Sequence, residues 1–165
     1  LLLCKYFIYM KQIIYFSCLF LIISSCLSEI EYRIPAFQAT INGTANWEAS
    51  DFSVTTNPLG EVIITGNDFN STISLRFPSN CQDCYHDLQV IGEATVLDTI
   101  QYSTLNIGIS DIDYPSDGEI YIREITPDSK ISGTFTFNAY NSSGESTVNI
   151  SQGVFYKLPL TQTTD

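Results

Sequence analysis

The stretch Lys130–Tyr140, K-I-S-G-T-F-T-F-N-A-Y, decides the fold class of this 165-residue chain. Every second residue from Ile131 to Ala139 is apolar or small, whereas serine, threonine and asparagine stand between them. A period of two places one set of side chains on a buried face and the other toward solvent, which is typical of a β-strand. The residues that follow, Asn141–Gly144, are turn formers. We therefore expect a strand that ends in a tight turn.

Similar short runs recur along the chain, between turn residues. Phe37–Ile41 alternates and precedes Asn42-Gly43, a pair typical of hairpin turns because both central residues need positive φ. Ala94–Tyr102 fits either a strand or a short helical turn, and no stretch keeps the 3.6-residue period of a helix. About nine or ten short strands predict an all-β, antiparallel domain. We expect a β-sandwich, with a lipocalin-like barrel as the alternative.

The segment Met10–Cys26 has the parts of an export signal. Lys11 precedes an apolar core, Ile13–Ile23, and small residues stand before a cysteine. The core is too short to span a bilayer, which needs about 20 apolar residues. Ile23-Ser24-Ser25-Cys26 matches the lipobox of bacterial lipoproteins, whose cysteine is acylated and becomes the N-terminus after cleavage. We predict that Cys26 carries a lipid; an ordinary signal peptide or an uncleaved anchor are the alternatives.

Five predicted segments follow from these features, with Met10 as the only methionine. They are upstream read-through (1–9), a lipoprotein signal peptide (10–25), a lipid-anchored tether (26–35), the β domain (36–160) and a polar tail (161–165). The expected location is the outer membrane of the bacterial cell envelope. The sequence does not indicate in which leaflet the lipid anchor lies.

The charge of the chain limits its partners. It carries 7 basic and 18 acidic side chains, a formal charge of −11. Such a chain repels the phosphates of nucleic acids, so we expect no nucleic-acid partner. The carboxylates are dispersed, which is typical of a solvated surface.

Two of the five cysteines, Cys81 and Cys84, belong to the predicted domain, and His86 follows them closely. A redox motif needs a helix N-terminus, and a zinc site usually needs four ligands; neither is evident here. In an oxidising compartment we predict a small loop disulfide between the two cysteines.

An acidic turn offers a weak calcium candidate. Its oxygen ligands would come from Asp111, Asp113, Asp117 and Glu119. The spacing differs from that of an EF-hand loop, and aspartate is common in turns because its side chain bonds its own backbone. We expect no resident metal and no cofactor.

Aromatic residues raise the possibility of a sugar-binding platform. Trp47, Phe135 and Phe137 fall on the apolar sides of their strands and are predicted core residues. Three tyrosines near predicted loops are better candidates for stacking on a ligand: Tyr85, Tyr102 and Tyr114.

No catalytic motif is found. The chain has no Gly-x-Ser-x-Gly, no His-Glu-x-x-His, no Gly-rich phosphate loop and one histidine. We therefore predict a non-enzymatic, membrane-anchored envelope protein that binds a ligand, a glycan or another protein. A structural or accessory subunit of an envelope complex is the second hypothesis. A small hydrolase that uses two carboxylates is the third.

Four segments resemble those of a family of short Bacteroidota lipoproteins with a single β domain of no assigned function. They are Phe37-x-Ala39-x-Ile41-Asn42-Gly43 with Trp47 and Ala49, Gly60 and Gly66 around an isoleucine-rich strand, Ile131-Ser132-Gly133-Thr134-Phe135-x-Phe137-x-Ala139, and Ile150-x-x-Gly153-x-Phe155. The resemblance implies an envelope lipoprotein and brings no catalytic residues; the Cys81-x-x-Cys84 loop is not part of it.

Overall fold

A computed structural model describes residues 36–79, 82–89, 91–106 and 117–162. All of them belong to the second of the two units of the chain, Tyr32–Asp165. Several predicted features lie outside the described residues: the signal peptide, the tether, Cys26, Cys81, Asp111, Asp113 and Tyr114.

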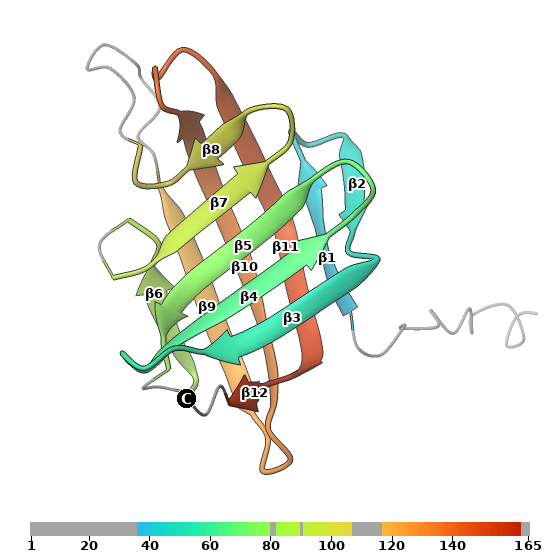
Figure 1. Ribbon diagram of the computed structural model, residues 1–165, viewed down its shortest axis with the longest axis vertical. Helices are drawn as coiled ribbons and strands as arrows, with labels where there is room; N and C mark the ends of the chain where they lie inside the picture. Colours follow the sequence, from blue (N-terminus) through green and yellow to red (C-terminus); the bar gives the residue numbers. More distant parts are fainter. Residues whose placement is uncertain (1–35, 80–81, 90, 107–116, 163–165) are drawn as a thin grey trace, which may run out of the picture. The chain divides into compact units, whose positions relative to one another are not determined.

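The described residues form strands joined by turns, which confirms the all-β prediction (Figure 1). Twelve strands are present in this part of the chain, two more than the upper expectation, because the shortest ones have too few residues to show alternation. They are β1 (Ala36–Ile41), β2 (Ala45–Glu48), β3 (Asp51–Thr56), β4 (Glu61–Asn67), β5 (Thr72–Pro78), β6 (Cys84–Asp87), β7 (Glu93–Leu97), β8 (Gln101–Ser103), β9 (Gly118–Ile125), β10 (Lys130–Asn141), β11 (Thr147–Pro159) and β12 (Thr161–Gln162).

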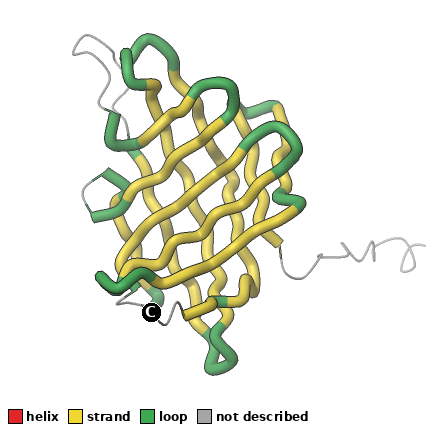
Figure 2. The backbone as a smooth tube through the Cα atoms, viewed as in Figure 1, coloured by secondary structure: helices red, strands yellow, loops and turns green. Residues whose placement is uncertain are grey.

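All described strands belong to one sheet, which curls into a half-barrel (Figures 1 and 2). Its order is β12-β3-β4-β5-β7-β8-β10-β11-β1-β2; β9 pairs with β10, and β6 pairs with β9. The pairs are antiparallel except β12 with β3. The expected sandwich of two sheets is not confirmed, because the layer in front (β3, β4, β5, β7) continues through β8 into the layer behind.

The long strand β10 makes this continuity possible. Ile131–Phe137 pairs with β9, whereas Tyr140 and Asn141 pair with β8. One edge of β10 therefore pairs first with β9 and then, further along the strand, with β8. The ambiguous segment Ala94–Tyr102 forms most of β7 and the start of β8, with a turn between them, so it is not helical.

Aromatic rings fill the core between the layers. The predicted core residues Trp47, Phe135 and Phe137 are 2 %, 3 % and 1 % exposed. The ring of Phe37 lies 5.2 Å from that of Trp47 and 5.5 Å from that of Phe135, both edge-on. Aliphatic side chains from both layers complete the core: Val54, Val62, Ile64, Ile73, Leu75, Val96, Ile120, Ile122, Ile131, Ile150 and Leu158.

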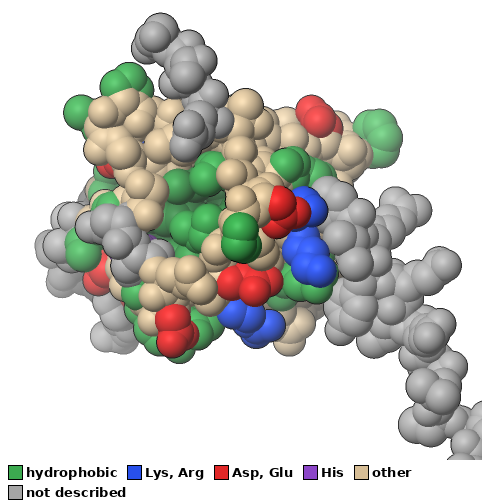
Figure 3. Space-filling view, turned by 90° about the horizontal axis from the view of Figure 1, so that it is seen from below, with side chains coloured by type: hydrophobic (Ala, Val, Ile, Leu, Met, Phe, Trp, Pro, Cys, Tyr) green, Lys and Arg blue, Asp and Glu red, His purple; other side chains and the backbone are tan. Residues whose placement is uncertain are grey.

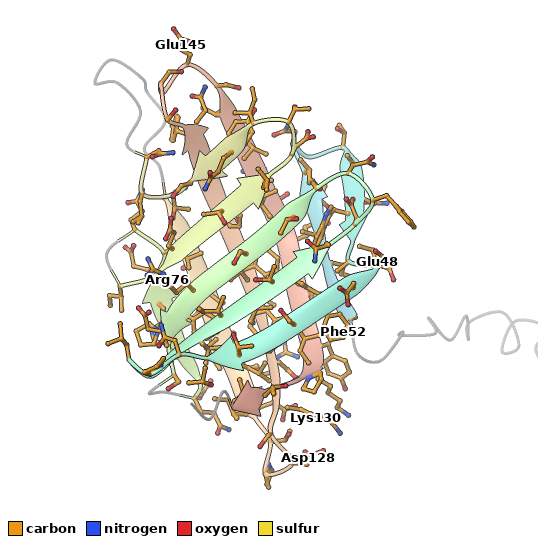
Figure 4. The ribbon with its side chains drawn as sticks, viewed as in Figure 1. Glu48, Phe52, Arg76, Asp128, Lys130 and Glu145 are labelled. Atoms are coloured by element: carbon orange, nitrogen blue, oxygen red, sulfur yellow. The ribbon has the colours of Figure 1, made fainter. Side chains whose placement is uncertain are left out.

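Hairpin turns gather at the two ends of the half-barrel. At one end lie the turns β1–β2, β4–β5, β7–β8 and β10–β11, the last carrying Glu145; Asp128 marks the opposite end (Figure 4). The Asn42-Gly43 turn is confirmed, since φ is 50° at Asn42 and 69° at Gly43. Viewed from the end near β12, hydrophobic side chains are visible between polar and charged ones (Figure 3).

Candidate functional site

One row of residues crosses the outer surface of six strands, β6, β9, β10, β11, β1 and β2. Its members lie directly opposite one another in register: Tyr85, Tyr121, Thr134, Val154, Gln38 and Glu48. Since neighbouring strands are about 4.8 Å apart, the row is about 24 Å long. We call the surface around this row the outer face.

Strand alternation explains why these side chains point outward. Phe37, Trp47 and Phe155 stand next to row members in the sequence, and all three are buried in the core. Successive residues of a strand point to opposite faces of a sheet, so the row members face away from the core. The outer face is thus the polar side of the amphipathic strands.

A pair of tyrosines stands at one end of the row. The rings of Tyr85 and Tyr121 lie 4.7 Å apart and are tilted by 31°. Tyr85 is 66 % exposed, which agrees with its prediction as an exposed ring near a loop. The hydroxyl of Tyr121 donates a hydrogen bond to the Asp83 carboxylate, which is the main reason that the pKa of Tyr121 is raised above 10.0. The Tyr121 ring is therefore held in place and stays neutral at neutral pH.

Three adjoining hollows lie along the row. The first has a volume of about 450 Å³ and is lined by Arg123 and Val154, among others. The second, about 300 Å³, lies beside Tyr121 and shares Val154 with the first. The third, also about 300 Å³, shares Gln38 with the first and Gln152 with the second. The three hollows therefore adjoin one another along the row, and we call them together the depression.

A bulge in β11 shapes this depression. Around Gln152, β11 has one residue more than its neighbours, which shifts its register with β1 and with β10. Gln152 has a φ of 52°, the left-handed conformation. Bulges bend a strand and redirect its side chains, and they are common beside binding sites. The amide of Gln152 thereby borders two of the hollows.

Amide, carboxylate, guanidinium and hydroxyl groups border the depression. Gln38 and Arg123 supply hydrogen-bond donors and acceptors to the first hollow, and Glu119 and Gln152 supply them to the second, beside Tyr121. Flat aromatic surface combined with mixed donors and acceptors suits a ligand that has both apolar faces and hydroxyl groups. The opposite layer is different: on β5, Arg76 is paired with Glu93 at 2.8 Å and with Glu61 at 3.8 Å (Figure 4).

The other predicted tyrosine does not join this face. Tyr102 is half-buried on β8, where its hydroxyl lies 3.2 Å from Ser146 Oγ. Tyr121 was not identified as a site residue from the sequence. The alternation of β9 is visible in the sequence, but the pairing of Tyr121 with Tyr85 is not. Only the register of β6 with β9 brings Tyr121 next to Tyr85.

The Cys-x-x-Cys-x-His segment lies at the start of β6. Cys84 is disulfide-bonded. Its predicted partner, Cys81, lies outside the described residues, so the pairing of the two stays a prediction. His86 is buried, its Nε2 lies 3.4 Å from Cys84 Sγ, and burial lowers its pKa. The described part of the chain has no group of three or more potential metal ligands.

Half of the acidic turn is described. Asp117 accepts a hydrogen bond of 2.7 Å from the Asn138 side chain, and Glu119 lies on β9 beside the second hollow. Asp111 and Asp113 lie outside the described residues, so the calcium hypothesis stays a prediction.

The fold and the outer face define a class: an antiparallel half-barrel domain with a tyrosine-bearing, hollowed sheet surface. The profile of a family described as "Domain of unknown function (DUF6252)" matches residues 33–159, and the chain belongs to this family. The comparisons with curated proteins and with solved structures give no match. Where the structure describes the chain, it has no helix long and apolar enough to cross a membrane.

Proposed function

We propose that this protein binds a neutral glycan on the outer face of its half-barrel, as a lipid-anchored protein of the bacterial cell envelope. The observation that carries the proposal is the Tyr85–Tyr121 pair, in register with Thr134, Val154 and Gln38. Sugar rings have an apolar face that stacks on aromatic rings, and hydroxyl groups that hydrogen-bond to amides and carboxylates. The outer face provides both kinds of group side by side.

The charge of the protein supports a neutral ligand. With a formal charge of −11, the chain repels anionic polymers over several ångströms at physiological salt. A single cation, Arg123, lies among the described residues that line the three hollows. Recognition therefore depends on stacking and hydrogen bonds rather than on ion pairing.

A glycan array probed with the purified protein tests the proposal. We expect binding to one class of neutral oligosaccharides, and we expect Tyr121→Ala or Tyr85→Ala to weaken it by about tenfold or more, as loss of an aromatic anchor does. Phe69→Ala is the matched control, because Phe69 is 95 % exposed in the β4–β5 turn, away from the row. No binding to any neutral glycan, or equal loss in all three variants, contradicts the proposal.

The membrane anchor rests on the lipobox that ends at Cys26. Cys26→Ala is expected to abolish incorporation of a labelled fatty acid in cells, whereas Cys18→Ala, within the apolar core of the signal, leaves labelling intact. Labelling that persists in Cys26→Ala contradicts the lipoprotein assignment.

An accessory role in an envelope complex is the second candidate. Two large apolar side chains, Leu59 and Phe69, are 84 % and 95 % exposed in turns. They lie in the turns at opposite ends of β4, so each would make a separate contact with a partner protein. Co-purification from crosslinked membranes tests this role: a specific partner that is lost in Leu59→Asp or Phe69→Asp supports it.

A further inference from the structure

We infer that the end of the half-barrel formed by four hairpin turns holds a second binding site, for a neutral polyol the size of a monosaccharide, and that the indole N–H of Trp47 is one of its hydrogen-bond donors. This site lies at the turn end of the half-barrel; of its lining residues, Asn46 and Trp47 also border the third hollow of the outer face. In β2, Trp47 points into the core, whereas the next residue, Glu48, belongs to the row on the outer face.

A cavity of about 310 Å³ lies at this end. Its walls come from the turns β1–β2, β4–β5 and β7–β8 and from the start of β11, and include Asn46, Trp47, Asp68, Asn70, Asp98 and Tyr102. Ligand sites favour the mouths of barrels and have volumes of about 300–1,000 Å³. This cavity is at the lower limit, which suits one sugar ring rather than an oligosaccharide.

Trp47 supplies the observation that points to a ligand. Its side chain is 2 % exposed, and its Nε1–H has no acceptor among the described residues. Buried polar groups are almost always hydrogen-bonded, because an unpaired one loses its bond to water without replacement. The ring itself is fixed by edge-on packing against Phe37, with 5.2 Å between centroids. A hydroxyl oxygen of a ligand in the cavity would give the N–H its acceptor.

The polar groups of the cavity select the ligand. Asp68 Oδ1 accepts hydrogen bonds from the backbone N–H groups of Asn70 and Ser71, at 2.7 and 2.5 Å, so its carboxylate is held in a fixed orientation. Asp98 Oδ1 is fixed likewise by Thr99 N–H, at 2.6 Å. Among the described residues, carboxylates and amides line the cavity and no Lys or Arg does. A neutral molecule with both hydroxyl donors and acceptors matches this set.

Entry of the ligand requires a local movement, because the N–H is covered. The β1–β2 turn next to Trp47 is suited to it: residues 42–46 are all exposed, and nothing lies within 4 Å of a Cβ built at Gly43. Asn42 is hydrogen-bonded to Asn149 of β11 at 2.8 and 2.9 Å, so the movement would be confined to residues 43–46.

Intrinsic fluorescence tests the inference, because Trp47 is the only tryptophan of the chain. The purified full chain is titrated separately with glucose, galactose, mannose and N-acetylglucosamine. We expect a saturable change of Trp47 emission with at least one sugar, at roughly millimolar concentration. Asp98→Ala is expected to weaken this response by about tenfold. Asp51→Ala, an exposed aspartate of β3 outside the cavity, leaves it unchanged.

Two results overturn the inference. One is the absence of a saturable emission change with all four sugars. The other is a change that Asp98→Ala and Asn70→Ala leave intact although both variants give the circular dichroism spectrum of the parent protein. Tyr121→Ala separates the two sites: the emission response persists in this variant if the cavity binds the sugar, and its loss would place the bound sugar on the outer face and contradict the inference.

Discussion

Three glycines determine how closely the aromatic rings pack in the core. A Cβ at Gly66 would lie 2.4 Å from the Phe37 ring, and one at Gly153 would lie 2.6 Å from the Phe135 ring. At Gly133 it would meet the Tyr121 carbonyl oxygen at 2.2 Å and the Phe155 ring at 2.4 Å. These distances are far below van der Waals contact, so the glycines leave room for the rings.

Gly133→Ala is therefore expected to lower the free energy of unfolding by about 3 kcal/mol, as overpacking of a core does. Gly43→Ala is the matched control: its Cβ meets nothing within 4 Å, and only its positive φ of 69° is unfavourable, for about 1 kcal/mol. Urea denaturation of both variants measures whether Gly133→Ala loses more unfolding free energy than Gly43→Ala. An equal loss, or a larger loss for Gly43→Ala, contradicts the packing argument.

The single histidine gives a pH dependence that can be assigned. Burial lowers the pKa of His86 below 6.5 in the folded state, so the fold favours the neutral ring. The contribution of the neutral His86 ring to the free energy of unfolding is fully present above about pH 6.5. Below that pH the unfolded chain binds a proton more readily than the folded chain. The free energy of unfolding therefore falls as the pH decreases toward the pKa of His86 in the folded state. Chemical denaturation between about pH 7.5 and 5.5 measures this slope.

His86→Gln is expected to flatten the slope in that window, because no other side chain of ordinary pKa titrates there. A slope that is unchanged in the variant would show that His86 is not its source.

At the scale of single residues, the sequence predicted the core better than the site. Trp47, Phe135 and Phe137 are buried as alternation predicted, because burial depends mostly on which face of a strand a residue occupies. The Tyr85–Tyr121 pair could not be found in this way, because it depends on the register of strands more than 30 residues apart in the chain.

At the scale of elements, β11 has the features that shape the outer face. Two of its residues, Gln152 and Lys157, have positive φ and coincide with shifts of register against β10. The hydroxyl of Ser132 accepts the backbone N–H of Lys157 at 3.0 Å, which fixes the second shift. The apolar positions of β11 therefore keep facing the core along 13 residues although its pairing changes twice.

Substitutions at Gln152 test the bulge. Gly and Asn adopt positive φ readily, whereas a β-branched residue does not. We expect Gln152→Gly and Gln152→Asn to stay within about 0.5 kcal/mol of the parent stability and Gln152→Val to lose about 1–3 kcal/mol. Thermal or urea unfolding measures the series. A Gln152→Val variant as stable as Gln152→Asn would contradict the left-handed conformation.

Most strands could be predicted from period-two alternation, but the bulges could not. An extra residue in one strand leaves the apolar pattern intact on both sides and changes only the pairing, which depends on the neighbouring strands. The Asn42-Gly43 turn was predictable because the turn itself demands these residues.

At the scale of the whole domain, the difference between a sandwich and a half-barrel lies in a few hydrogen bonds. β8 has three residues, and it joins β7 of one layer to β10 of the other. The three residues of β8 are too few to show that it pairs with both β7 and β10. Alternation alone could therefore not distinguish a sandwich from a half-barrel. The all-β class could be predicted because many strands indicate it together, whereas the continuity of the sheet from one layer to the other depends on the pairing of β8 alone among the described strands.

A neutral glycan is expected to bind on the outer face. Backbone amide NMR of the protein, titrated with an oligosaccharide that binds on the array, tests it most directly. We expect the shifted signals to cluster on Tyr85, Tyr121, Thr134, Val154 and Gln38, with the amides of β4 and β5 unchanged. Shifts that cluster on β4 and β5, and leave the row unchanged, would contradict the assignment of the outer face as the binding surface.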